Sequence, residues 1–96
     1  MQMIMIAYNE SVDMEVMEII ESCGVRNYSK AAETFGRGGS SGTHLGTDTW
    51  PGLNNILFAA CPGEAARKVL AQIRELRKPL GKTGVKAFSW KLDEMT

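Results

Sequence analysis

The side chains of this chain that could do chemistry are concentrated in one glycine-rich stretch, residues 35–52. It holds six of the ten glycines and the only histidine. In Gly36-Arg37-Gly38, backbone N–H groups beside a guanidinium suit phosphate oxygens. This segment is not a Walker A loop, because no Gly-Lys-Ser/Thr follows at the required spacing. A second basic turn, at residues 82–86, contains Gly84 and Lys86. Together the two segments predict an anion-binding site.

The remainder of the glycine-rich stretch is predicted to have a functional role. Compact domains rarely keep a connection of more than about a dozen residues unless it has a role. This one carries Ser40, Ser41, His44 and Trp50. His44 and Asp48 would supply only half of a metal site, so a solvated histidine is the preferred interpretation and no metal centre is predicted.

Composition limits the classes of protein to which the chain can belong. Ninety-six residues, zero net charge and no long apolar run predict a single domain at residues 1–96, without membrane insertion or nucleic-acid binding. The first residues lack the basic start of a signal peptide, so a cytoplasmic protein is expected. Cys23 and Cys61 are predicted to be small buried hydrophobes rather than disulfide partners or metal ligands. The glycine-rich stretch has no nucleophile–base pair and no paired carboxylates, so the chain is not expected to be an enzyme.

The apolar pattern predicts six elements in the order strand, helix, strand, strand, helix, strand. Ser11 is expected to cap the first helix and Gly24 to end it. Asn55 to Cys61 is a nearly continuous apolar run, typical of a strand buried on both faces. The expected strands span residues 3–8, 25–35, 55–61 and 85–92, and the second helix begins at residue 62 and is ended by Pro79.

This order is typical of the ferredoxin-like βαββαβ fold, an α+β architecture in which two helices cover one face of a four-stranded antiparallel sheet. The other face stays bare unless something covers it. Since apolar and aromatic residues occur on both faces of the strands, a sheet from another subunit is the expected cover.

The element order and three short motifs resemble the P-II nitrogen-regulatory signalling proteins and their P-II-like relatives. Phe35-Gly36-Arg37 is similar to the Phe-Gly-Arg that opens the long signalling loop of the family. Residues 84–88 (Gly-Val-Lys-Ala-Phe) and 92–95 (Leu-Asp-Glu-Met) are similar to the Gly-Lys-Ile-Phe and Val-Glu-Glu-Val run of the family's last core strand. The resemblance spans nearly the whole chain.

The resemblance implies a homotrimer with a nucleotide in each cleft between neighbouring subunits. Carried over, the phosphate contacts fall to Gly36, Arg37, Gly84 and Lys86. The effector would be a small anion: an adenine nucleotide (ATP, ADP or AMP) is the first candidate, and another anion is the alternative. The loop at about residues 36–53 would report occupancy of the site to a target protein, such as a membrane transporter or an enzyme of nitrogen regulation.

The chain also departs from the family pattern. Thr34 stands where the family has glycine, and Val85 replaces the second glycine of the phosphate-binding turn. Gly38 replaces a glutamine that helps bind magnesium and 2-oxoglutarate, and the loop lacks the tyrosine that is uridylylated. A P-II-like regulator is therefore predicted rather than a classical nitrogen sensor. The alternative is a metal-responsive trimer of the related CutA type, with His44, Asp48 and a cysteine as ligands.

Overall fold

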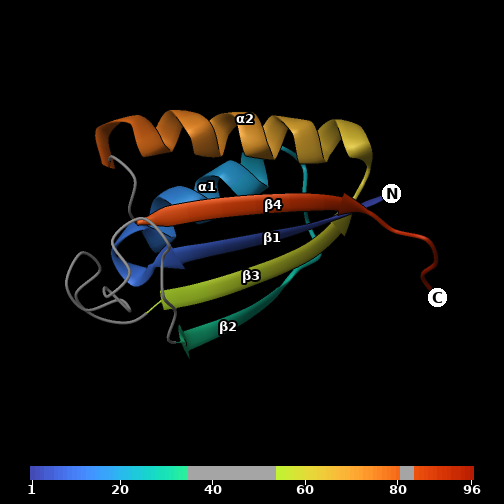
Figure 1. The fold of residues 1–96 in the computed structure, drawn as a ribbon, viewed down its shortest axis with the longest axis horizontal. Helices are drawn as coiled ribbons and strands as arrows, with labels where there is room; N and C mark the ends of the chain where they lie inside the picture. Colours follow the sequence, from blue (N-terminus) through green and yellow to red (C-terminus); the bar gives the residue numbers. More distant parts are fainter. Residues whose placement is uncertain (35–53, 81–83) are drawn as a thin grey trace.

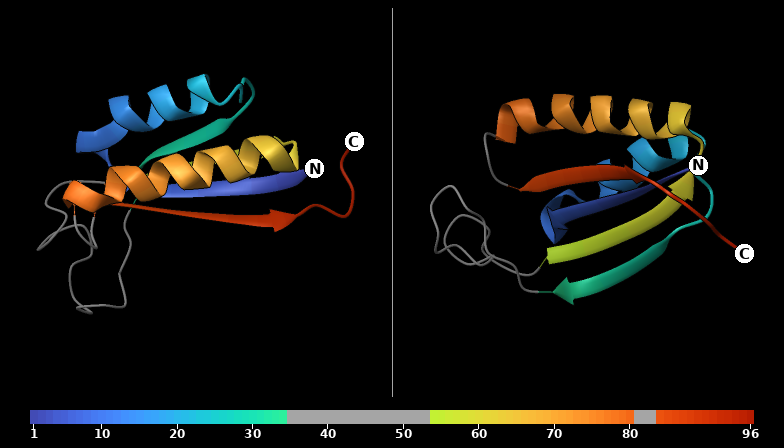
Figure 2. Two further views of the ribbon diagram at one scale, coloured as in Figure 1. Left: turned by 90° about the horizontal axis from the view of Figure 1, so that it is seen from above. Right: turned by 45° about the vertical axis from the view of Figure 1, so that its right-hand side comes forward.

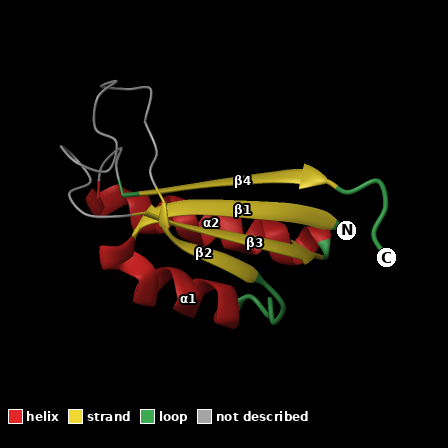
Figure 3. Ribbon diagram, turned by 90° about the horizontal axis from the view of Figure 1, so that it is seen from below, coloured by secondary structure: helices red, strands yellow, loops and turns green. Residues whose placement is uncertain are grey.

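The chain folds as a four-stranded antiparallel sheet with two helices on one face, which confirms the ferredoxin-like prediction. The computed structural model describes residues 1–34, 54–80 and 84–96. Both helices lie over the same face of the sheet (Figures 1 and 2), and the strands face the viewer in Figure 3. The elements are β1 (Gln2–Asn9), the 3₁₀ turn η1 (Glu10–Val12), α1 (Asp13–Ser22), β2 (Ser29–Thr34), β3 (Asn54–Cys61), α2 (Gly63–Leu80) and β4 (Val85–Lys91).

The strand order β2-β3-β1-β4 places β1 and β3 in the centre of the sheet. Directly paired residues point to the same face, so the register separates two sets of side chains. Ile6 pairs with Leu57 and Ala87 on the face that the helices cover. Met5 pairs with Phe58 and Phe88 on the opposite face.

The core lies between the sheet and the helices. Alternate residues of the central strands and the inner stripe of each helix fill it, as their spacing predicts. Its fully buried members include Ile4, Ile6, Tyr8, Val16, Leu57, Val69 and Val85.

The first helix begins differently from the prediction. Ser11 does not cap it: the Asn9 side chain accepts a hydrogen bond from the Ser11 backbone N–H at 2.9 Å and caps the short turn η1. The α-helix then starts at Asp13, with Val12 at its N-cap position and no side-chain cap. The chain turns through a single 3₁₀ turn before the helix, so the cap lies at the last residue of β1.

The second strand is shorter than the predicted 25–35. Gly24 ends the helix as expected, with a φ of 81°. The Val25 N–H donates to the Ile20 carbonyl at 3.1 Å, so Val25 still belongs to the helix ending, and the strand starts only at Ser29. Similarly, Pro79 lies inside α2 rather than beyond it, since the helix continues to Leu80. A proline in the last turn removes one hydrogen bond without preventing the final residue from being helical.

The sheet face away from the helices is apolar and open. Phe58, Phe88 and Trp90 on it are 39%, 40% and 45% exposed. The prediction that β3 is buried on both faces is therefore wrong for a single chain, because its burial alternates along the strand. The other residues that the register places on this face, beside the three aromatic side chains, include Met3, Met5, Ala7, Ala31, Ile56 and Ala60.

A helix that crosses a membrane needs about 20 consecutive, predominantly apolar residues. Neither α1 nor α2 combines the length and the hydropathy that crossing a bilayer requires.

Candidate functional site

All four strands reach the same end of the sheet, next to residues 35–53 and 81–83. In an antiparallel sheet of this order, β1 and β2 end where β3 and β4 begin (Figure 1). Asn9 and Thr34 are the last residues of the first pair of strands, and Asn54 and Val85 are the first residues of the second pair. Both predicted anion-binding segments therefore border this end of the sheet in sequence.

Gly84 and Lys86 lie at the start of β4, on this end of the sheet. The Gly84 carbonyl accepts a hydrogen bond from the Asn9 N–H at 2.8 Å, which ties the turn to the end of β1. The φ of Gly84, 96°, lies in the left-handed region that favours glycine. Lys86 pairs with Ala7 and is exposed on the open face of the sheet, where its ammonium group is available to an anion.

Replacing Gly84 by alanine is expected to lower the free energy of unfolding by about 1–2 kcal/mol, because an L-residue is strained at this φ. The added Cβ itself would have room, since its closest contact is Leu80 Cδ1 at 3.4 Å. Chemical denaturation of the variant checks this. Gly63→Ala, at the ordinary start of α2, is the control, and it is expected to be neutral or slightly stabilising. Equal stabilities for the two variants would contradict the strain at Gly84.

The strands that adjoin the two predicted anion-binding segments, β2 and β4, lie at opposite edges of the sheet. Lys86 is on β4 and the first segment follows β2, at the opposite edge of the sheet. With strands spaced at about 4.8 Å, the two edges are roughly 14 Å apart. The other predicted residues of this region lie outside the described residues: Gly36, Arg37, Gly38, Ser40, Ser41, His44, Asp48 and Trp50.

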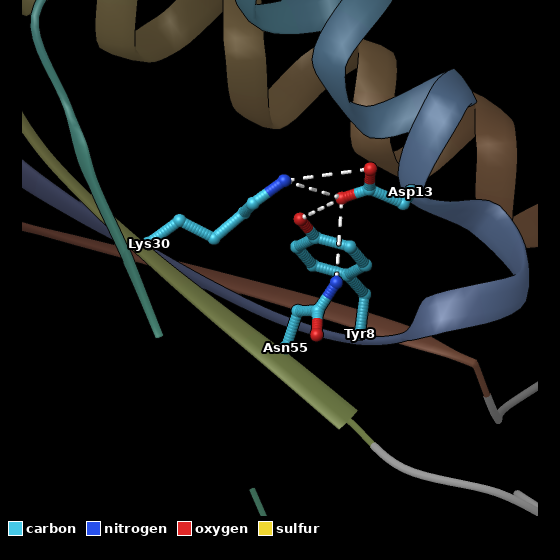
Figure 4. Close-up of polar contacts among 4 residues, drawn as sticks. All are labelled: Tyr8, Asp13, Lys30 and Asn55. Carbon is cyan, nitrogen blue, oxygen red and sulfur yellow. Dashed lines mark hydrogen bonds and ion pairs between the residues drawn. The ribbon is translucent and has the colours of Figure 1, made fainter. Parts of the chain in front are cut away.

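A polar cluster that the sequence analysis did not single out lies beside this end of the sheet, on the helix side (Figure 4). The Tyr8 hydroxyl donates to Asp13 Oδ1 at 2.6 Å. Lys30 Nζ contacts the same carboxylate, at 3.1 Å from Oδ1 and 3.4 Å from Oδ2. Asn55 Nδ2 donates to Oδ1 at 3.3 Å. The Asp13 carboxylate, at the first residue of α1, therefore accepts from a side chain of each of β1, β2 and β3.

Asn55 is oriented by this contact. A carboxylate can only accept, so the amide nitrogen must face Asp13 and Oδ1 must face away from it. Asn55 is 5% exposed, and its Oδ1 has no hydrogen-bond partner. An open hollow beside the cluster is lined by Asn9, Glu10, Ser11, Asp13, Lys30, Ala32 and Asn55. Because Asn55 Oδ1 is sealed from solvent, a molecule in this hollow would meet the Lys30 ammonium and the Asp13 carboxylate rather than that oxygen.

The contacts shift the pKa values of both acids in the cluster. The hydrogen bond from Tyr8, followed by those from Lys30 and Asn55 and the charge of Lys30, holds the pKa of Asp13 below its ordinary value, against partial desolvation. Burial, together with the hydrogen bond and charge of Asp13, raises the pKa of Tyr8 well above its ordinary value. At neutral pH the cluster therefore contains an ionised carboxylate and a neutral phenol.

Asp13 is expected to stabilise the fold at neutral pH and to lose this effect in acid. A lowered pKa in the folded state gives a contribution that is complete above the ordinary value of 3.8 and disappears as the pH falls through the folded-state pKa. The free energy of unfolding of the wild type should therefore exceed that of Asp13→Asn at about pH 6, and the gap should close towards about pH 2. Denaturant titrations across this range measure it. A gap that stays constant with pH would contradict the assignment.

Among the described residues, the acidic side chains and the two cysteines are the candidates for metal binding or thiol chemistry. Within the described ranges, no group of three or more His, Cys, Asp or Glu side chains is placed to hold a metal ion. Cys23 and Cys61 are free thiols that pack in or against the core. Burial, with a smaller effect of Cys23, raises the pKa of Cys61, so this thiol stays protonated at neutral pH. Both cysteines thus behave as the small hydrophobes that their sequence positions predict.

Solved structures with the same fold are PII-like proteins. A PII-like signalling protein from Thermus thermophilus is 22% identical, with a TM-score of 0.65 over 93% of this chain and 83% of that one. CPII, a nitrogen regulatory PII-like protein from Thiomonas intermedia, was solved bound to ADP, AMP and bicarbonate. It is 13% identical, with a TM-score of 0.72 over 95% of this chain and 88% of that one. The structure of CPII bound to ADP and bicarbonate aligns with this chain at 17% identity and a TM-score of 0.68. This alignment covers 97% of this chain and 88% of that one.

No protein-family model matches the sequence, and no curated protein matches it either. The likeness to the solved structures thus defines the fold, and the chain has the fold of PII-like signalling proteins.

Proposed function

We propose that this protein is a non-catalytic, PII-like regulator that assembles as a homotrimer and binds an adenine nucleotide in clefts between its subunits. The observation that carries the proposal is the position of Gly84 and Lys86. They lie at the same end of the sheet as the end of β2, which leads into Gly36-Arg37, yet at the opposite edge. A second subunit that brings its β2 edge beside β4 would complete an anion site that one chain leaves divided.

The open face of the sheet supports the assembly. Monomeric soluble proteins rarely expose a continuous apolar surface of this kind. Here three aromatic side chains and two methionines lie on adjacent strands of one face. Burying this face against the sheets of two further copies removes the aromatic side chains from water and stabilises the assembly by the hydrophobic effect.

Chemistry at the end of the sheet supports an anionic ligand. Lys86 provides an exposed ammonium group, and Gly84, two residues before it, has the positive φ that glycine adopts without strain. CPII, which has the same fold, was solved with ADP and AMP. An adenine nucleotide is accordingly the first effector to test.

Signalling would pass through residues 36–53 to a target protein, such as a membrane transporter or an enzyme of nitrogen regulation. Ser40, Ser41, His44 and Trp50 are the proposed contacts with that target. Ligand-dependent ordering of a segment is a common switching mechanism. The protein is expected to act in the cytoplasm.

Calorimetric titration with ATP, ADP and AMP, with and without magnesium, tests the proposal. The mass of the assembly is measured on the same sample. One binding site per subunit in a particle of three 10.5 kDa chains is the expected result. An intact trimer that gives no heat with any of the three nucleotides would overturn the assigned ligand, and a monomer would overturn the assembly.

A further inference from the structure

Asp13 joins three strands, two of which, β2 and β3, flank residues 35–53 in sequence. Lys30 is the second residue of β2, four residues before its last residue Thr34, and Asn55 is the second residue of β3. Both donate to the Asp13 carboxylate, and so does Tyr8 of β1 (Figure 4). One side chain at the start of α1 therefore contacts the strand before residues 35–53, the strand after them and the central strand between β3 and β4.

In a single chain the strand β2 has a neighbouring strand on one side only. Within the described residues it is an edge strand, paired only with β3. That pairing is irregular between Ala31 and Thr34, where the register shifts. An edge strand with an interrupted ladder is free to move at its end unless a side chain anchors it. The contact from Lys30 to Asp13 lies immediately before the irregular part.

The cluster is built to keep Asp13 charged and in place. Tyr8 is fully buried and its hydroxyl lies 2.6 Å from the carboxylate, a short charge-assisted hydrogen bond. Asp13 and Lys30 are each about one third exposed, so their ion pair alone is screened by solvent and would be worth little. The buried Tyr8 and Asn55 therefore fix the position of the Asp13 carboxylate. Lys30 then connects the edge strand β2 to this carboxylate.

We propose that Asp13 is a positioning residue that holds β2, through Lys30, and the start of β3, through Asn55, in the geometry needed for ligand binding. The inference rests on the proposed function for its effect on affinity, but the anchoring of the two strands is independent of that function. The residue touches no proposed ligand. It acts through Lys30 on β2 and through Asn55 on β3. Gly36 and Arg37 follow β2 in sequence.

Hydrogen exchange and ADP titration of Asp13→Asn test this proposal, with Glu15→Gln as the matched control. Glu15 is exposed in the same first turn of α1, so both variants remove one negative charge from the same helix end. Asp13→Asn is expected to speed exchange of amides in residues 29–34 and 54–57 about tenfold, with those of α2 unchanged. It should weaken ADP binding roughly three- to thirtyfold. Glu15→Gln should change neither.

A second variant, Lys30→Met, keeps the buried part of the cluster and removes only the contact to the edge strand. Faster exchange confined to residues 29–34 is expected, which supports the anchoring. Exchange in Asp13→Asn equal to that in Glu15→Gln would overturn it. Wild-type ADP affinity in Asp13→Asn, despite faster exchange, would overturn the effect on the ligand site. If the wild type binds no nucleotide, the proposed function fails, and the exchange rates alone support or overturn the anchoring of the strands.

Discussion

Replacing Phe88 by lysine is expected to convert the proposed trimer into monomers that remain folded. Phe88 lies in one row with Met5 and Phe58, across three neighbouring strands of the open face. In a trimer closed over this face, three lysines would be brought into an apolar interface. Each would cost several kcal/mol to desolvate without a partner. In the separated chain the same position is 40% exposed, so a lysine there reaches water and the fold survives.

Ser89→Lys is the matched control, because Ser89 is the next residue of β4, points to the other face and is exposed. Light scattering after size-exclusion chromatography measures the mass, and circular dichroism checks the fold. The Phe88 variant should have the mass of one chain and the Ser89 variant that of three. Nucleotide binding should be lost with the trimer, since the proposed clefts lie between subunits. A trimeric Phe88→Lys would show that another surface forms the assembly.

The fold was largely predictable from the sequence because local patterns determine it. Alternation in residues 3–8 separates Ile4 and Ile6 from Met3 and Met5, and the helical spacing of Val16, Ile19 and Ile20 identifies the buried side of α1. The errors occurred where the local signal was ambiguous. Ser11 and Asn9 are both good capping residues. Only the hydrogen bond from the Ser11 N–H to the Asn9 side chain shows that Asn9 is the cap of the turn η1.

The candidate site was predictable only in part. Gly84 and Lys86 could be proposed as site residues because glycine and lysine in a turn have a chemical meaning that needs no tertiary information. The Asp13 cluster was missed because its members are 5, 17 and 42 residues apart from Asp13. In sequence, Asp13 has an adequate explanation as an acid in the first turn of a helix. Nothing local indicates that Tyr8, Lys30 and Asn55 converge on it, and only the strand register brings them there.

Removing either of the two proposed phosphate contacts is expected to weaken nucleotide binding. Lys86→Ala and Arg37→Ala are each expected to weaken nucleotide binding by roughly ten- to a hundredfold without unfolding the protein, because each removes a charged hydrogen bond to a phosphate. Lys86 is exposed, so its replacement leaves the core intact. The control is Lys91→Ala, which removes a lysine from the far end of the same strand and should bind as the wild type does. Unchanged affinity in both Lys86→Ala and Arg37→Ala would contradict the assigned site.

Mixing the two variants tests whether Lys86 and Arg37 come from different subunits. A cleft that takes Arg37 from a Lys86→Ala chain and Lys86 from an Arg37→Ala chain has both native side chains. In trimers reassembled from equal amounts of the two variants, about a quarter of the clefts should be of this kind, by the cyclic symmetry of the assembly. Calorimetry should therefore recover about a quarter of the wild-type sites at wild-type affinity. If one chain supplied both residues, no mixed trimer would contain an intact site, and recovery would be absent.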